Sequence, residues 1–83
     1  MIPTIHIGSS IRAELTRQQK TMVWLADQLG TARPNAYRIV RASSLQTDSL
    51  FRISKILEHD FFAEYSRKLA IDQTNNNHKN NNN

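Results

Sequence analysis

The chain has 83 residues, a formal net charge of +4 and no cysteine. This length fits a single domain, and without cysteine neither a disulfide framework nor a thiolate metal site can support the fold. No apolar run approaches the roughly 20 residues that a membrane span needs, and the stretch MIPTIHIGSS lacks the positive start of a secretory signal. We therefore expect a cytoplasmic protein with no membrane partner.

The charges are unevenly placed along the chain. From Arg17 to Lys55 there are seven cations and two acids, whereas from Glu58 to Asp72 there are four acids and two cations. A basic middle beside an acidic flank favours a polyanionic partner that meets the middle. A second explanation stays open, because many small soluble domains are mildly basic.

The N-terminal segment is expected to be extended. Apolar and polar side chains alternate within residues 1–8, which predicts a short arm or edge strand that ends at Gly8. A first helix should follow, because the hydroxyl of Ser9 or Ser10 can cap the unpaired amides of a first turn. That helix is expected to end near Gln19.

A second, short helix is predicted between Thr21 and Gly30. Thr21 is a good N-cap, and Gly30 stops the helix because glycine enters the left-handed region at little cost. The apolar positions follow the spacing of one helical face. They are Met22, Leu25, Ala26 and Leu29. Trp24 lies off this face, so we expect it at the edge of the core, with contact to a partner as the alternative.

A third helix is predicted almost immediately after this turn. It should begin near Ala32 or Arg33, with Thr31 as a possible cap, because Pro34 is tolerated only in a first helical turn. Its inner face is expected to hold three apolar residues, Ala36, Ile39 and Val40.

Two further helices are expected beyond a polar loop at 42–47. Thr47 should cap the fourth and Asp60 the fifth, since both side chains can accept from first-turn amides. Their apolar faces comprise Leu50, Ile53, Ile56 and Leu57, then Phe61 or Phe62, Tyr65 and Leu69. The run TNNNHKNNNN that follows has almost nothing apolar to bury, so we expect a disordered Asn-rich tail.

The sequence therefore predicts an all-α protein, a compact bundle of about five short helices. We expect an N-terminal arm at 1–8, one folded domain at 9–72 and the disordered tail at 73–83.

The most informative stretch is residues 21–41, TMVWLADQLGTARPNAYRIVR. It describes two short helices joined through Gly30 by a turn too tight to leave them parallel, which is typical of a helix-turn-helix. The hexapeptide at 25–30, LADQLG, and the polar helix, loop and Thr-capped helix after it resemble the Cro/repressor type of helix-turn-helix domain, also called the XRE family. The resemblance covers residues 9–66. It implies a lambda-repressor-like fold and sequence-specific binding of double-stranded DNA.

The resemblance also implies which residues meet DNA. Residues at the start of the third helix and one turn later would contact bases, here Arg33, Asn35, Tyr37 and Arg38. Arginine can pair with guanine and asparagine with adenine, whereas Pro34 has no side-chain donor. Backbone contacts would come from Thr21, Thr31, Arg41, Ser43 and Ser44. The chain departs from the family at Met22, where a polar residue is frequent, and at Val40, where an acid is frequent.

No catalytic constellation is visible in the sequence. His6, His59 and His78 lie far apart, without the spacing of metal ligands or of a catalytic triad. We therefore expect no enzyme activity, no cofactor and no small-molecule ligand. The leading hypothesis is a homodimeric transcriptional regulator that binds double-stranded DNA. A protein-interaction module that uses the same helical fold is the alternative, and RNA binding is a third option with little aromatic surface to support it.

Overall fold

The structure, a computed structural model, describes the backbone of residues 4–77 and the side chains of residues 4–71. It contains five helices: α1 (Ile7–Arg17), α2 (Met22–Leu29), α3 (Arg33–Arg41), α4 (Thr47–Leu57) and α5 (Phe62–Asn77). Residues 4–77 contain no strand. The all-α class and the number of helices are therefore as the sequence predicts.

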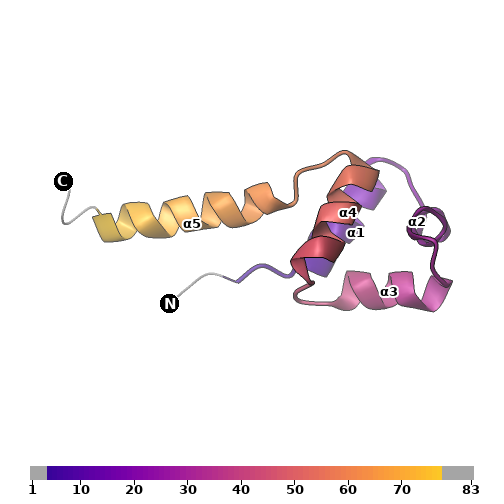
Figure 1. The fold of residues 1–83 in the computed structure, drawn as a ribbon. Helices are drawn as coiled ribbons and strands as arrows, with labels where there is room; N and C mark the ends of the chain where they lie inside the picture. The colour runs from indigo at the N-terminus through magenta and orange to yellow at the C-terminus, as the bar shows by residue number, and fades with distance from the viewer. Residues whose placement is uncertain (1–3, 78–83) are drawn as a thin grey trace.

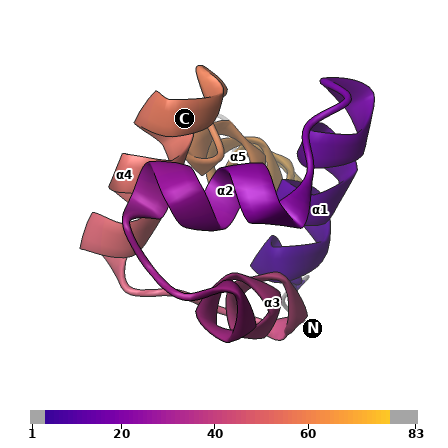
Figure 2. The same cartoon turned by 90° about the vertical axis from the view of Figure 1, so that its right-hand side faces the viewer.

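The first four helices enclose one core, and the fifth leads away from it (Figure 1). Figure 2 shows α2 in front, with α1 and α4 on either side of it and α3 beneath. α3 contacts both α1 and α2. Because α5 projects, the molecule is 50 Å long and only 21 Å across.

The core draws apolar side chains from α1, α2, α3 and α4. The apolar residues predicted to face inward in α2, α3 and α4 contribute to this core. α1 buries Ile7, Ile11 and Leu15. The buried apolar residues are Ile7, Ile11, Leu15, Met22, Leu25, Ala26, Ala36, Ile39, Val40, Leu50, Ile53, Leu57 and Phe61. Leu29 and Ile56 are partly buried against this cluster.

The start of α1 corrects the predicted arm. The helix begins at Ile7, two residues before the predicted boundary, and its N-cap is His6, whose Nδ1 accepts from the amide of Ser9 at 3.2 Å. Gly8 is therefore inside the helix and does not end an extended segment. The amides of Ile7 and Gly8 donate to the carbonyls of Ser43 and Ala42, at 3.2 and 2.9 Å. These bonds join the start of α1 to the chain just beyond α3.

The predicted helix caps are partly right. Thr21 caps α2, since its hydroxyl accepts from the amide of Trp24 at 3.0 Å, and Gly30 ends α2 in the left-handed region with φ 67°. Asp60 Oδ1 accepts from the amide of Phe62 at 3.0 Å, at the start of α5. Thr47, however, is the first residue of α4 rather than its cap.

The position before α4 belongs to Gln46, whose side chain makes no capping bond. The position before α3 belongs to Ala32, which has no capping side chain. Thr31 is therefore not the cap of α3. Pro34 is the second residue of α3, inside the first turn, as its missing amide requires.

α5 continues further than the sequence suggests. It reaches Asn77, so the helix includes residues 73–77 of the predicted disordered tail, and residues 78–83 lie outside the described part of the chain. A helix satisfies its backbone groups internally, so it can extend beyond the core that supports its first turns.

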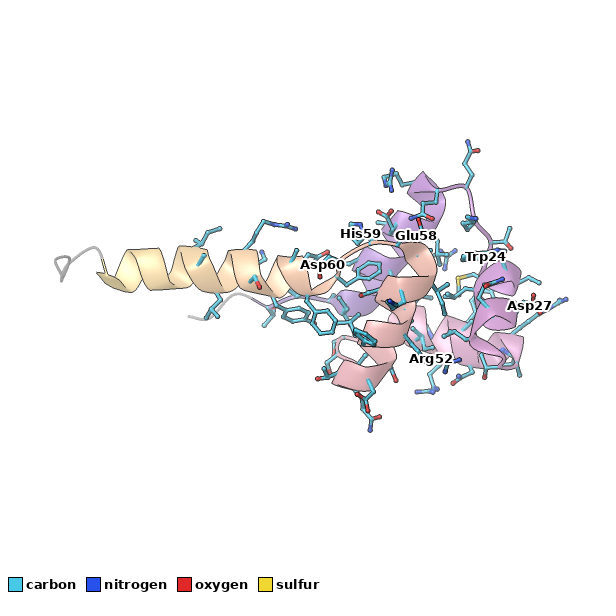
Figure 3. The ribbon with its side chains drawn as sticks, turned by 45° about the horizontal axis from the view of Figure 1, so that its top comes forward. Trp24, Asp27, Arg52, Glu58, His59 and Asp60 are labelled. Atoms are coloured by element: carbon cyan, nitrogen blue, oxygen red, sulfur yellow. The ribbon has the colours of Figure 1, made fainter. Side chains whose placement is uncertain are left out.

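A buried acid joins α1 to the corner between α4 and α5. Glu14 is only 7% exposed, and its carboxylate accepts from Nε and Nη2 of Arg17. Gln18 Nε2 donates both to Glu14, at 2.7 Å, and to the carbonyl of Leu57, at 2.8 Å. His59 Nδ1 lies 3.6 Å from Glu14 Oε1. Figure 3 shows His59 in this corner between Glu58 and Asp60.

The Arg17 hydrogen bond lowers the pKa of Glu14 to about 2, against the opposing effect of burial. The carboxylate therefore stabilises the fold fully above pH 4.5, and this contribution is lost as the pH falls towards 2. We expect Glu14→Gln to reduce the free energy of unfolding by about 1–3 kcal/mol at pH 7. The deficit should shrink between pH 4.5 and 2 in urea titrations. Glu58→Gln, at an exposed site, is the control, and a deficit that is constant with pH would contradict the assignment.

Candidate nucleic-acid interface

α3 presents a basic outer face. Its buried residues Ala36, Ile39 and Val40 face the core, and the helical period places the rest of the helix towards solvent. Exposed residues on α3 are Arg33, Pro34, Tyr37, Arg38 and Arg41. The nine residues of α3 include three arginines and no acid. This helix is therefore the most basic element of the part of the chain that the structure describes.

The turn before α3 fixes how this helix crosses α2. Gly30 donates its amide to Asp27 at 3.1 Å, and Thr31 donates its amide to Ala26 at 3.0 Å. Gly30 adopts the left-handed conformation in this turn, and the small Ala26 is buried. The two short helices α2 and α3 therefore cross after this turn, within residues 22–41 (Figure 2).

Three of the predicted site residues are joined by hydrogen bonds. Asn35 Nδ2 donates to Thr31 Oγ1 at 3.0 Å. Arg38 donates to Asn35 Oδ1 through Nε, at 3.0 Å, and also through Nη2. Asn35 is half-buried, whereas Arg38 is exposed. This series of side-chain hydrogen bonds, from Thr31 through Asn35 to Arg38, thus runs from the turn to the outer face of α3.

A polar cleft of about 600 Å³ lies beside this series of hydrogen bonds, between α3 and α4. Thr31, Asn35, Arg38 and Ser44 line it, so the structure brings together four residues that the sequence nominated separately. It also adds Arg52, which donates through Nη2 to the carbonyl of Leu29 at 3.0 Å. The remaining lining residues are Leu29, Gly30, Ile39, Leu45, Gln46, Ser49 and Ile53, and none of the twelve is acidic.

Arg52 is a residue that the sequence reasoning missed as part of the site. It reaches from α4 across to the end of α2 (Figure 3). In the sequence it stands eleven residues beyond α3, as one more cation of the basic middle. The sequence offered one signal for Arg52: its helical position beside the buried Ile53 leaves Arg52 itself on the exposed side of α4.

The other nominated residues do not line this cleft. Arg41 and Ser43 are exposed at the end of α3, where the carbonyl of Ser43 accepts from Ile7. Thr21 lies at the opposite end of α2 from Gly30, and its hydroxyl is used as the cap acceptor. Of the nominated residues, Arg33, Tyr37 and Arg41 form no hydrogen bond through their side chains among those found in residues 4–71.

Trp24 stands at the edge of the core, as expected. It is half-buried against the core cluster, and Lys20 Nζ lies 4.3 Å from the centre of its ring. The indole thus holds an ammonium group next to the start of α2.

Within the described residues, no three His, Asp or Glu side chains are grouped closely enough to hold a metal ion. No described helix combines the length and the apolar character that a membrane crossing needs. No family model, curated protein or solved structure matches the chain.

Proposed function

We propose that this chain is a sequence-specific, double-stranded DNA-binding protein of the helix-turn-helix kind, similar to the XRE family, which inserts α3 into a major groove. One observation carries the proposal. α3 is braced from below by Ala36, Ile39 and Val40, and its outer face offers three arginines with no acid. A major groove is wide enough for one helix, and arginine is the most frequent reader of guanine.

The surroundings of α3 supply backbone contacts in this proposal. Arg41 and Ser43 would meet a phosphate at the end of α3, and Ser44 would do so in the cleft. Thr21 and Thr31 would do so at the two ends of α2. Arg52 joins this set because it lines the same cleft as Thr31 and Ser44. Arg33 and Arg38 would contact bases, and Tyr37 would touch a thymine methyl or a phosphate.

The protein would act in the cytoplasm as a homodimeric regulator of transcription, because one recognition helix meets too few base pairs for high specificity. The exposed side of α5 is the surface that would join two copies. Phe62, Tyr65 and Leu69 share a helical face there. Tyr65 and Leu69 are 39% and 57% exposed.

A protein-interaction module is the second candidate function. It is favoured by large apolar side chains that stay exposed away from α3. Phe51 is 58% exposed and Ile71 60%. In that case the arginines of α3 would only be solvated surface charges.

Selection from a random duplex library at low salt tests the two candidates. DNA binding should enrich one site, with two half-sites about 10–10.5 base pairs apart if the protein is a dimer. Affinity for that site should fall steeply as salt rises, because phosphate contacts release counterions. A library that yields no enriched site would favour the protein-interaction module.

Two variants should separate base reading from backbone contact. We expect Arg38→Ala to weaken binding to the selected site by about 1–3 kcal/mol and to relax the preference at one base pair. Arg41→Ala should weaken binding to every duplex alike and reduce the salt slope by about 1. Fluorescence anisotropy against the selected site and its single-base variants measures both effects. Equal, sequence-independent losses from the two variants would refute base reading by Arg38.

A further inference from the structure

The side-chain amide of Asn35 is hydrogen-bonded to Thr31 and to Arg38. We infer that Asn35 is a positioning residue, which holds the Arg38 guanidinium for guanine, and is not itself a reader of adenine. The inference rests on the proposed function, since it says how α3 would distinguish one base from another.

The orientation of the Asn35 amide follows from its neighbour. Arginine has donors and no acceptor, so the amide atom that faces the Arg38 guanidinium must be the oxygen. The amide nitrogen then points to Thr31 Oγ1, at 3.0 Å, which accepts its proton. Both polar atoms of the Asn35 side chain are therefore engaged within the protein.

This engagement conflicts with adenine reading. A bidentate contact with adenine requires an amide oxygen that accepts from N6 and an amide nitrogen that donates to N7. In Asn35 the oxygen already accepts from two nitrogens of Arg38. The side chain is also half-buried, on the flank of α3 that faces the cleft.

The same bonds leave the reading edge of Arg38 free. Arg38 donates to Asn35 Oδ1 through Nε and through one proton of Nη2. The two terminal nitrogens of Arg38 therefore still have protons that point away from Asn35. This pair of donors matches the O6 and N7 acceptors of guanine, whereas adenine presents a donor at the corresponding N6 position. A guanidinium held in this way would prefer guanine to adenine.

The support reaches back to the turn between α2 and α3. Thr31, which anchors Asn35, is held by its own amide bond to the carbonyl of Ala26. The turn that sets the crossing of the two helices therefore also sets the orientation of Arg38. Less rotamer freedom is then lost when Arg38 meets a base.

The test compares Asn35→Ala, Arg38→Ala and the double variant on the selected duplex and on duplexes with each base pair changed. We expect Asn35→Ala to reduce the guanine preference about 2- to 10-fold at the same base pair that Arg38→Ala relaxes. The double variant should lose no more preference there than Arg38→Ala alone. Asn35→Asp is the rescue variant. It keeps the acceptor, so the guanine preference should persist even though its added charge weakens binding to all duplexes. Arg33→Ala with Asn35→Ala is the additive control.

The free protein gives an independent measurement. The arginine Nε–H signal that Arg38→Ala removes from the NMR spectrum should exchange slowly with water, and Asn35→Ala should speed that exchange. An unchanged signal would overturn the positioning role, whatever the selection returns. The role would also be overturned if Asn35→Ala relaxed an adenine at a different base pair, additively with Arg38→Ala. A library with no enriched site would instead overturn the proposed function, and guanine reading with it.

Discussion

Gly8→Ala should destabilise the protein by about 3 kcal/mol, although alanine is the better helix former. A Cβ at this position would stand 2.4 Å from the carbonyl oxygen of Val40 and 2.7 Å from that of Ala42. Both are backbone atoms near the end of α3, so no side chain can rotate away to make room. The start of α1 would have to move, and the bonds from Ile7 and Gly8 to Ser43 and Ala42 would be lost with it.

Urea unfolding followed by circular dichroism measures this effect. Gly30→Ala is the matched control, because a Cβ at Gly30 meets nothing within 4 Å and the cost there is only the left-handed backbone. That cost is about 1–2 kcal/mol. Helix propensity alone would make Gly8→Ala stabilising by about 1 kcal/mol. A more stable Gly8→Ala protein would therefore contradict the close approach of α1 to α3.

Phe61→Ala should remove about 3–5 kcal/mol, the usual cost of truncating a buried phenylalanine. Phe61 is fully buried and is the largest of the completely buried side chains. Its ring packs edge-on against His59, with ring centres 4.6 Å apart. It directly precedes α5, so it fastens the start of that helix to the core.

Such a loss approaches the whole stability of a domain of this size, so Phe61→Leu provides a milder step of less than about 1.5 kcal/mol. Phe51→Ala is the matched control, because Phe51 is 58% exposed in the neighbouring helix. It should change the unfolding free energy by no more than about 0.5 kcal/mol. Equal losses at positions 51 and 61 in the same urea titration would show that Phe61 is not the anchor.

The spacing of apolar residues and the residues that begin or end helices predict most of this fold. Local signals in the sequence are matched by the structure. They are the apolar spacing in α2 and α4, the cap at Thr21 and the stop at Gly30. Gly8 shows what local signals cannot predict. Its lack of a side chain serves a contact with residues 40–42, and nothing near Gly8 in the sequence indicates a neighbour so far along the chain.

The candidate site divides in the same way. Composition and helical phase predict that α3 is basic outside and apolar inside. They do not predict that Asn35 would be engaged by Thr31 and Arg38, because two or three rotamers of each side chain fit the same backbone. The contact of Arg52 with the end of α2 was not predicted either, because only the fold brings α4 close to that end.

Trp24 gives the molecule a built-in optical signal. It is the single tryptophan in the chain, so the emission spectrum of the protein has one indole source. Its ring is half-buried and carries the Lys20 ammonium at 4.3 Å. Unfolding exposes the ring to water, whereas a phosphate near the start of α2 would draw the ammonium away and leave the ring half-buried. The two events should therefore have different fluorescence signatures, with no label attached.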